Sequence, residues 1–133
     1  RFVDSGLNTL DTYRNDKYGF EFKYPAQLSF LETEPIPGCV LRTAFEEIGE
    51  GDVPTRIFLC VSKSLAEARN VLGPQVQWVA STLGGKQLLE AKTGYPILLV
   101  ELENGEGLRI DTPVPLPGFD IVNIIKTSFR FVE

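Results

Sequence analysis

Four aromatic residues at alternate positions, Tyr18, Phe20, Phe22 and Tyr24, constrain the fold of this chain more than any other feature. Successive side chains of a β-strand point to opposite faces, so this spacing places all four rings on one side. Pro25 predicts the end of the strand, because proline cannot donate a ladder hydrogen bond. We therefore expect a strand whose aromatic face forms sheet core and is covered by amphipathic helices.

The rest of the chain alternates short strand-like stretches with turn signals. Gly84-Gly85 and Asn104-Gly105 are dipeptides typical of hairpin turns. A two-residue turn at the second dipeptide would set Glu103 against Glu106, so a longer loop through Gly107 is an equal alternative. The stretches with strand character are 10–14, 28–32, 39–45, 56–62, 76–83, 86–92, 97–103 and 108–112.

Two short helices are also predicted. Ser64 and Glu67 form a capping box, and Gly73 followed by Pro74 predicts the end of that helix. Asp120 is placed as the N-cap of a C-terminal helix, and residues 129–131 are expected to leave it as an edge strand. Hairpin-connected strands without regular βαβ alternation indicate a mainly antiparallel α+β sandwich, with residues 10–133 as one domain and 1–9 as a leader.

Composition excludes several classes of function. None of the apolar runs in the 133 residues approaches the ~20 residues of a membrane-spanning helix. A net charge of −5 argues against nucleic acid or anionic lipid as partners, because both attract a basic surface. The chain does not begin with methionine, so we expect a processed form or an excised piece, which favours an exported protein.

Catalytic chemistry has few candidate residues. The chain contains no histidine, which excludes Ser-His-Asp and Cys-His arrangements and removes the commonest general base. A glycan hydrolase needs two carboxylates about 5–9.5 Å apart. The candidates for such a pair are Glu101, Glu103 and Asp111. The alternative is that they mark the solvated face of a strand, and we expect the protein not to be an enzyme and to need no cofactor.

One acidic run offers a candidate metal site. Glu46, Glu47, Glu50 and Asp52 lie in one stretch with two glycines, and carboxylate oxygens suit calcium. The spacing of these acids matches no EF-hand, so the alternative interpretation is a solvated hairpin tip. A calcium-stabilised scaffold therefore remains a hypothesis alongside the hydrolase.

Three further residues are singled out by type. Cys39 and Cys60 are the two cysteines, and their spacing of 21 residues is no redox motif, which leaves a disulfide or two inert core thiols. A disulfide is expected if the protein is exported. Trp78, the single tryptophan, is either an interface anchor or a core ring of its strand.

The two ends of the chain carry a family resemblance. The stretch 13–25, Tyr-Arg-Asn-Asp-Lys-Tyr-Gly-Phe-Glu-Phe-Lys-Tyr-Pro, resembles the opening of PsbP-like domains, above all the bacterial exported and lipoprotein branch. The stretch 125–131, Ile-Lys-Thr-Ser-Phe-Arg-Phe, is similar to that family's closing helix and strand. Together the two motifs cover about 20 of the 133 residues.

The resemblance implies an α/β/α sandwich around a central antiparallel sheet. It also implies an extracytoplasmic setting (periplasmic, cell-surface or lumenal), in which such a domain often follows a lipid anchor. Family members of known function, such as the lumenal subunits of photosystem II, act by binding a protein. We therefore expect a non-catalytic domain that binds an unknown protein partner or assists a complex.

Overall fold

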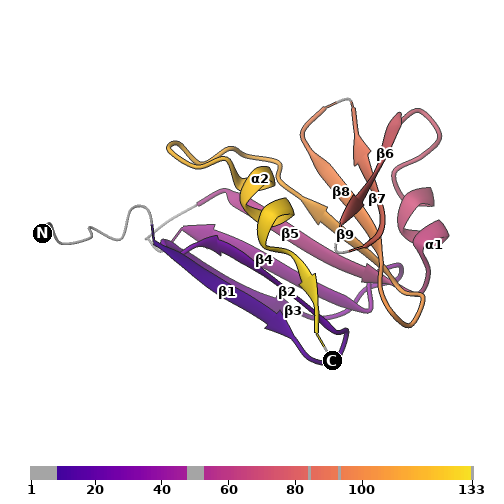
Figure 1. Ribbon diagram of the computed structural model, residues 1–133, viewed down its shortest axis with the longest axis horizontal. Coiled ribbons are helices and arrows are strands. Elements are labelled where there is room, and N and C mark those ends of the chain that lie inside the picture. Colours follow the sequence, from indigo (N-terminus) through magenta and orange to yellow (C-terminus); the bar gives the residue numbers. More distant parts are fainter. Residues whose placement is uncertain (1–8, 48–52, 84, 93, 133) are drawn as a thin grey trace, which may run out of the picture.

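The protein, a computed structural model in which residues 9–47, 53–83, 85–92 and 94–132 are described, is built mainly from β-strands (Figure 1). Within these ranges there are ten strands and two helices. The strands are β1 (Leu10–Asn15), β2 (Phe20–Pro25), β3 (Leu28–Thr33), β4 (Leu41–Glu47), β5 (Thr55–Ser62), β6 (Trp78–Leu83), β7 (Lys86–Ala91), β8 (Ile97–Glu101), β9 (Gly107–Asp111) and β10 (Arg130–Phe131). The helices are α1 (Leu65–Asn70) and α2 (Ile121–Ser128). Each strand-like stretch of the sequence thus contains a strand.

The strands form two antiparallel sheets. The small sheet has three strands in the order β1-β2-β10, and the large sheet has seven in the order β3-β4-β5-β9-β8-β7-β6. All pairs between neighbouring strands are antiparallel, which confirms that part of the prediction. The second hairpin takes neither predicted form, because the Leu102 amide bonds the Glu106 carbonyl at 2.8 Å across a three-residue loop.

The predicted α/β/α sandwich is wrong. An eight-residue helix is about 12 Å long, whereas seven strands span about 29 Å, so neither helix can form a layer over the large sheet. The small sheet instead packs on one face of the large sheet, together with α2. On the other face, α1 contacts only one part, over β5, β8 and β9.

Of the four alternating aromatic residues, Phe20, Phe22 and Tyr24 lie on β2 and are buried, as predicted, but most of their cover is another sheet. The prediction is wrong for Tyr18, which lies in the turn before β2 and is only half-buried. Phe20 and Phe22 are fully buried, in one cluster with Phe45 of the large sheet. The ring of Tyr24 lies 4.9 Å from that of Phe45, edge to face. Among the described residues, helical cover comes from α2 alone, whose C-cap residue Phe129 stacks on Phe20 at 5.8 Å. The expectation that helices cover this face therefore holds for α2 alone.

Local signals place both helices. Ser64 caps α1 by accepting a hydrogen bond from the Glu67 amide at 3.1 Å, and Asp120 caps α2 in the same way. The start of α1 then lies close against β9 at Gly107, where an added Cβ would stand 2.6 Å from the Ser64 carbonyl oxygen. Only glycine fits there. No helix within the described ranges is long and apolar enough to cross a membrane.

Candidate functional site

An apolar cleft of about 340 Å³ lies where the chain enters β8, leaves β9 and begins α2. Its walls are mostly aromatic rings, prolines and aliphatic side chains, a lining typical of binding sites, with Thr112 and Asp120 as the polar members. The apolar lining includes Tyr95, Pro96, Pro113, Pro115, Phe119 and Val122. We call this site the Tyr95 cleft.

The connector that follows β9 forms one wall, because its prolines cannot continue the ladder. Thr112 closes the end of the strand by donating to the Pro96 carbonyl from its amide at 3.0 Å and from its hydroxyl at 3.2 Å. Leu116 is buried and anchors the connector in the core. Arg56 of β5 donates a hydrogen bond to the Pro115 carbonyl. The wall is therefore held in place before anything binds.

A buried polar cluster borders the cleft. Arg109 Nε pairs with Asp111 Oδ1 at 2.9 Å, and both side chains are nearly inaccessible to solvent. The Tyr95 hydroxyl is 3.4 Å from Asp111 Oδ2. The Arg109 guanidinium also lies 5.9 Å from the centre of the Phe58 ring, within cation–π range. Each Asp111 oxygen thus has a polar neighbour in the protein.

The charges of this cluster are shifted by burial. Burial raises the pKa of Asp111, and the neighbouring Arg109 charge and hydrogen bond only partly oppose it. Burial also raises the pKa of Tyr95, and the Asp111 charge adds to this. Perturbed carboxyls often occur in functional sites, although structural ion pairs produce them as well. Because the Asp111 oxygens already face Arg109 and Tyr95, the arrangement suits binding better than proton transfer.

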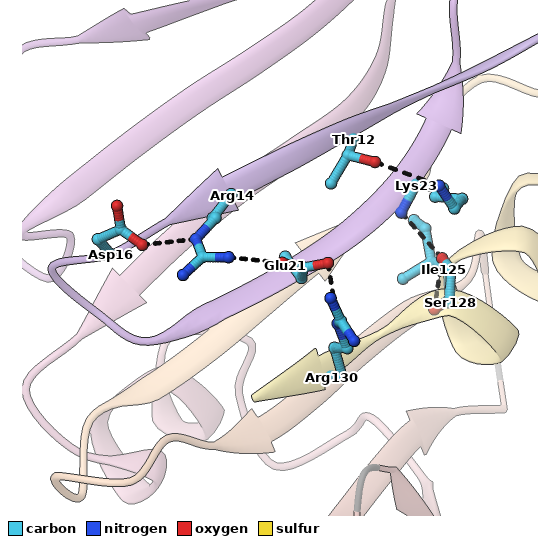
Figure 2. A network of polar contacts seen from close by, with 8 residues as sticks. All are labelled: Thr12, Arg14, Asp16, Glu21, Lys23, Ile125, Ser128 and Arg130. Carbon is cyan, nitrogen blue, oxygen red and sulfur yellow. Dashed lines mark hydrogen bonds and ion pairs between the residues drawn. The ribbon is translucent and has the colours of Figure 1, made fainter. Parts of the chain in front are cut away.

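A second polar network lies on the outer face of the small sheet (Figure 2). Glu21 of β2 accepts hydrogen bonds from Arg14 of β1 at 3.4 Å and from Arg130 of β10 at 2.9 Å. Arg14 also pairs with Asp16 at 2.6 Å. One carboxylate therefore connects all three strands of the small sheet. This is a structural role, and exposed pairs of this kind contribute little energy each.

The end of α2 is joined to β2 beside this network, as Figure 2 shows. The Lys23 backbone amide donates to Ser128 Oγ at 2.8 Å, and Ser128 Oγ donates to the Ile124 carbonyl at 2.6 Å. β10 does not extend along β2 as far as Lys23. The Ser128 hydroxyl therefore accepts the hydrogen bond that a carbonyl of a neighbouring strand would otherwise accept. The Lys23 ammonium is 3.3 Å from Thr12 Oγ1. A groove of about 530 Å³ lies here, but its polar lining includes Glu21, Lys23 and Ser128, which already hold the small sheet and α2 together.

The three candidate catalytic carboxylates are not brought together. Asp111 lies opposite Ile97 in the β8–β9 pair, and Glu101 lies four residues further along β8, about 13 Å away on the same face. That separation exceeds the range of a glycosidase pair. Glu103 follows β8 in an exposed loop, 3.6 Å from Lys86. The β8–β9 register therefore keeps Asp111 apart from Glu101.

The candidate metal ligands are only partly within the described residues. Glu46 accepts a hydrogen bond from Thr55 at 3.2 Å, and Glu47 pairs with Arg56, so both acids serve the β4–β5 hairpin. Glu50 and Asp52 lie outside the described residues. Within the described ranges, no three Asp, Glu or Cys residues lie close enough to hold a metal ion.

Cys39 and Cys60 form a disulfide, with their Cα atoms 5.3 Å apart. The two residues are not directly opposite, because Cys60 faces Arg42 in the β4–β5 register. Cys39 precedes β4 and is held by a bridge to Ile36. The bond therefore ties the turn before β4 to the middle of β5.

Trp78 lies at the start of β6 and is partly buried. It packs on a small cluster formed by Ala68 of α1, Leu89 of β7 and Leu99 of β8. The ring thus belongs to the contact between α1 and the large sheet. The interface prediction for this residue stays a prediction.

The residues of the Tyr95 cleft were not singled out in the sequence. The proline-rich stretch 113–117 gives a visible signal, since it predicts a stiff connector. No local pattern shows that this connector meets Tyr95 and the start of α2, because those segments come together only through the β8–β9 pairing. Comparison with known proteins adds no assignment: no family model matches the chain, and no curated protein shows significant similarity to it.

Proposed function

We propose that this chain is a non-catalytic, extracytoplasmic domain that binds a protein partner, and that the Tyr95 cleft receives an apolar side chain of that partner. The preformed apolar cleft is the observation that carries the proposal. The Arg109 and Asp111 charges at its border are paired, and the Asp120 carboxylate in its lining is exposed and accepts the Asn123 amide, so an apolar group can enter without leaving a charge buried and unpaired.

The chemistry of the lining favours a protein partner. Tyr95 is 42% exposed at the cleft, and tyrosine is enriched at protein interfaces because its ring is apolar and its hydroxyl can hydrogen-bond. Prolines restrict the backbone of the opposite wall, which lowers the entropy lost when a partner docks. Three prolines and two aromatic rings thus provide a rigid apolar cleft beside the Tyr95 hydroxyl.

Two observations support the extracytoplasmic setting. Disulfides such as Cys39–Cys60 persist mainly in oxidising compartments. The terminal motifs resemble PsbP-like domains, above all the exported and lipoprotein branch, and the members of that family with known function bind proteins. A lipid anchor in a longer form of the chain is compatible with this setting and belongs to the same proposal.

The experiment is affinity capture with the oxidised domain as bait and the envelope fraction of the source organism as prey. Four baits are compared by quantitative mass spectrometry: wild type, Tyr95→Ala, Val122→Lys and Leu31→Ala. Leu31 is the matched control, since it is an apolar side chain, 69% exposed, on β3. We expect a protein that wild type and the control enrich and that both cleft variants lose by about tenfold or more.

Two outcomes would contradict the proposal. The first is that wild type enriches nothing over an unrelated bait. The second is that every enriched protein binds the cleft variants as well as wild type. Circular dichroism of each variant establishes beforehand that a lost signal does not come from unfolding.

A further inference from the structure

Strand β6 forms one edge of the large sheet and is unusually open. It pairs with β7 on one side and is the last strand in the sheet order. The four consecutive residues from Val79 to Thr82 are all exposed, although they alternate between the two faces. The sequence contains no charged residue between Arg69 and Lys86. This edge is therefore accessible from both faces and carries no charge.

Alternate residues of β6 hydrogen-bond to β7, and this alternation identifies the backbone groups that face outward. The Lys92 amide donates to the Gln77 carbonyl at 2.9 Å, immediately before the pair of Trp78 and Ala91. Bonds between antiparallel strands involve every second residue, so odd-numbered residues of β6 bond to β7. The backbone N–H and C=O groups of Trp78, Ala80 and Thr82 consequently point away from the sheet. Only an extended backbone offers matching donors and acceptors.

Two other strands at sheet edges are protected in ways that β6 is not. Edge strands are commonly protected from pairing with another chain by charged residues, prolines or short length. β1 carries Asp11 and Arg14, and β3 carries Glu32 and is followed by Pro35. β6 is six residues long and has neither a charge nor a proline. The contrast indicates that this edge is available for pairing.

We propose that two copies of the protein pair antiparallel through β6, about a two-fold axis at Ala80. In this register Trp78 of one copy faces Thr82 of the other, Ala80 faces Ala80, and Val79 faces Ser81. Every outward N–H and C=O of the three even-numbered residues then has a partner, which gives six hydrogen bonds. No like charges meet. The small Ala80 side chain lies at the axis, where the same residue must face itself.

This assembly is independent of the Tyr95 cleft and goes beyond the proposed function. It joins two seven-stranded sheets into one continuous sheet, in an isologous contact of the kind found in most homodimers. A six-residue strand contact alone is smaller than a standard interface. We therefore expect a weak dimer, with a dissociation constant above about 1 µM.

Amide hydrogen exchange by NMR tests the register residue by residue. Spectra of the oxidised protein are recorded from about 10 µM to about 1 mM, a range that brackets a weak dimer. We expect exchange of the Trp78, Ala80 and Thr82 amides to slow about tenfold when nine tenths of the chains are paired. The Val79 and Ser81 amides bond to β7 and should be protected equally at all concentrations. Concentration-independent exchange of the outward amides overturns the proposal.

Sedimentation equilibrium supplies the second readout. Ala80→Lys places two like charges opposite each other at the axis and should weaken the dimer by about tenfold or more. Leu31→Lys puts the same charge on β3 at the opposite edge of the sheet and should leave the dimer unchanged, as should Tyr95→Ala in the cleft. A wild type that stays monomeric over the whole range overturns the proposal, and so does an Ala80→Lys dimer as tight as wild type. Association that Leu31→Lys also abolishes has the same consequence.

Discussion

Replacing Cys39 and Cys60 together with alanine should lower the stability of the fold by a large and calculable amount. The disulfide joins residues 21 positions apart and restricts the unfolded chain. In the chain-entropy model, a closed loop of this length is worth about 3.3 kcal/mol at 25 °C. Small domains have a total free energy of unfolding of about 5–15 kcal/mol, so the bond is a substantial part of it.

The assay is urea unfolding followed by tryptophan fluorescence, since Trp78 packs on the cluster beneath α1. Reduced wild type loses the bond but keeps both sulfur atoms, whereas the double variant also loses the contacts of the buried Cys60 side chain. We expect both to be less stable than oxidised wild type by about 3 kcal/mol, with the double variant lower by the lost packing. The slope of unfolding free energy against urea should rise, because an unfolded chain without the bond exposes more surface.

Single replacements complete the test. Either one removes the bond, so each should lose nearly as much stability as the double variant, and the two losses should not add. Oxidised and reduced wild type that differ by less than about 1 kcal/mol would refute the chain-entropy reasoning. Additive single losses would show instead that packing of each cysteine is the main effect.

Two further changes test the site and the small sheet. Burial raises the folded pKa of Asp111 above its ordinary 3.8, so stability present below pH 3.8 is lost as pH rises through the folded pKa. Urea unfolding at several pH values should show this loss in wild type and not in Asp111→Asn. The variant also leaves Arg109 unpaired, but that cost does not depend on pH and so does not affect the slope of unfolding free energy against pH. Equal slopes in the two proteins would contradict the assignment to Asp111. Ser128→Ala removes the acceptor of the Lys23 amide and should cost about 0.5–1.5 kcal/mol in thermal unfolding, because the amide is exposed and water can replace the acceptor. Thr127→Ala, whose hydroxyl bonds only carbonyls of its own helix, is the control, and an equal loss in the two would contradict the role of Ser128.

Local patterns in the sequence predict most individual elements, because their causes are local. The alternation of Phe20, Phe22 and Tyr24 requires a strand with one buried face. The Ser64 and Asp120 side chains lie where each helix begins, since a cap depends on residues only three positions away. The disulfide partners are also within reach of prediction, because there are two cysteines and their segments form a hairpin.

The candidate site could not be predicted, because its residues are brought together by contacts between distant segments. Arg109 and Asp111 show a polar spacing of two on a buried strand, which was a usable signal for their cluster. Tyr95 reaches them only because β8 pairs with β9, and the proline connector reaches Tyr95 only because Thr112 bonds to Pro96. Glu101 and Asp111 show the same limit, since only the β8–β9 register reveals that they lie about 13 Å apart.

The sequence by itself determined which segments are strands or helices and which face of each is apolar. Their ends were less well determined, because β2 begins at Phe20 and not at Tyr18. An alternation of apolar side chains along a strand shows that one face must be buried, but it does not show which element buries that face. Tertiary structure decided that β2 pairs with β10, more than a hundred residues away, and that this small sheet covers the large one together with α2. It also decided that β6 remains an open edge. Those outcomes depend on pairing between distant segments, whose free energy no local stretch of sequence contains.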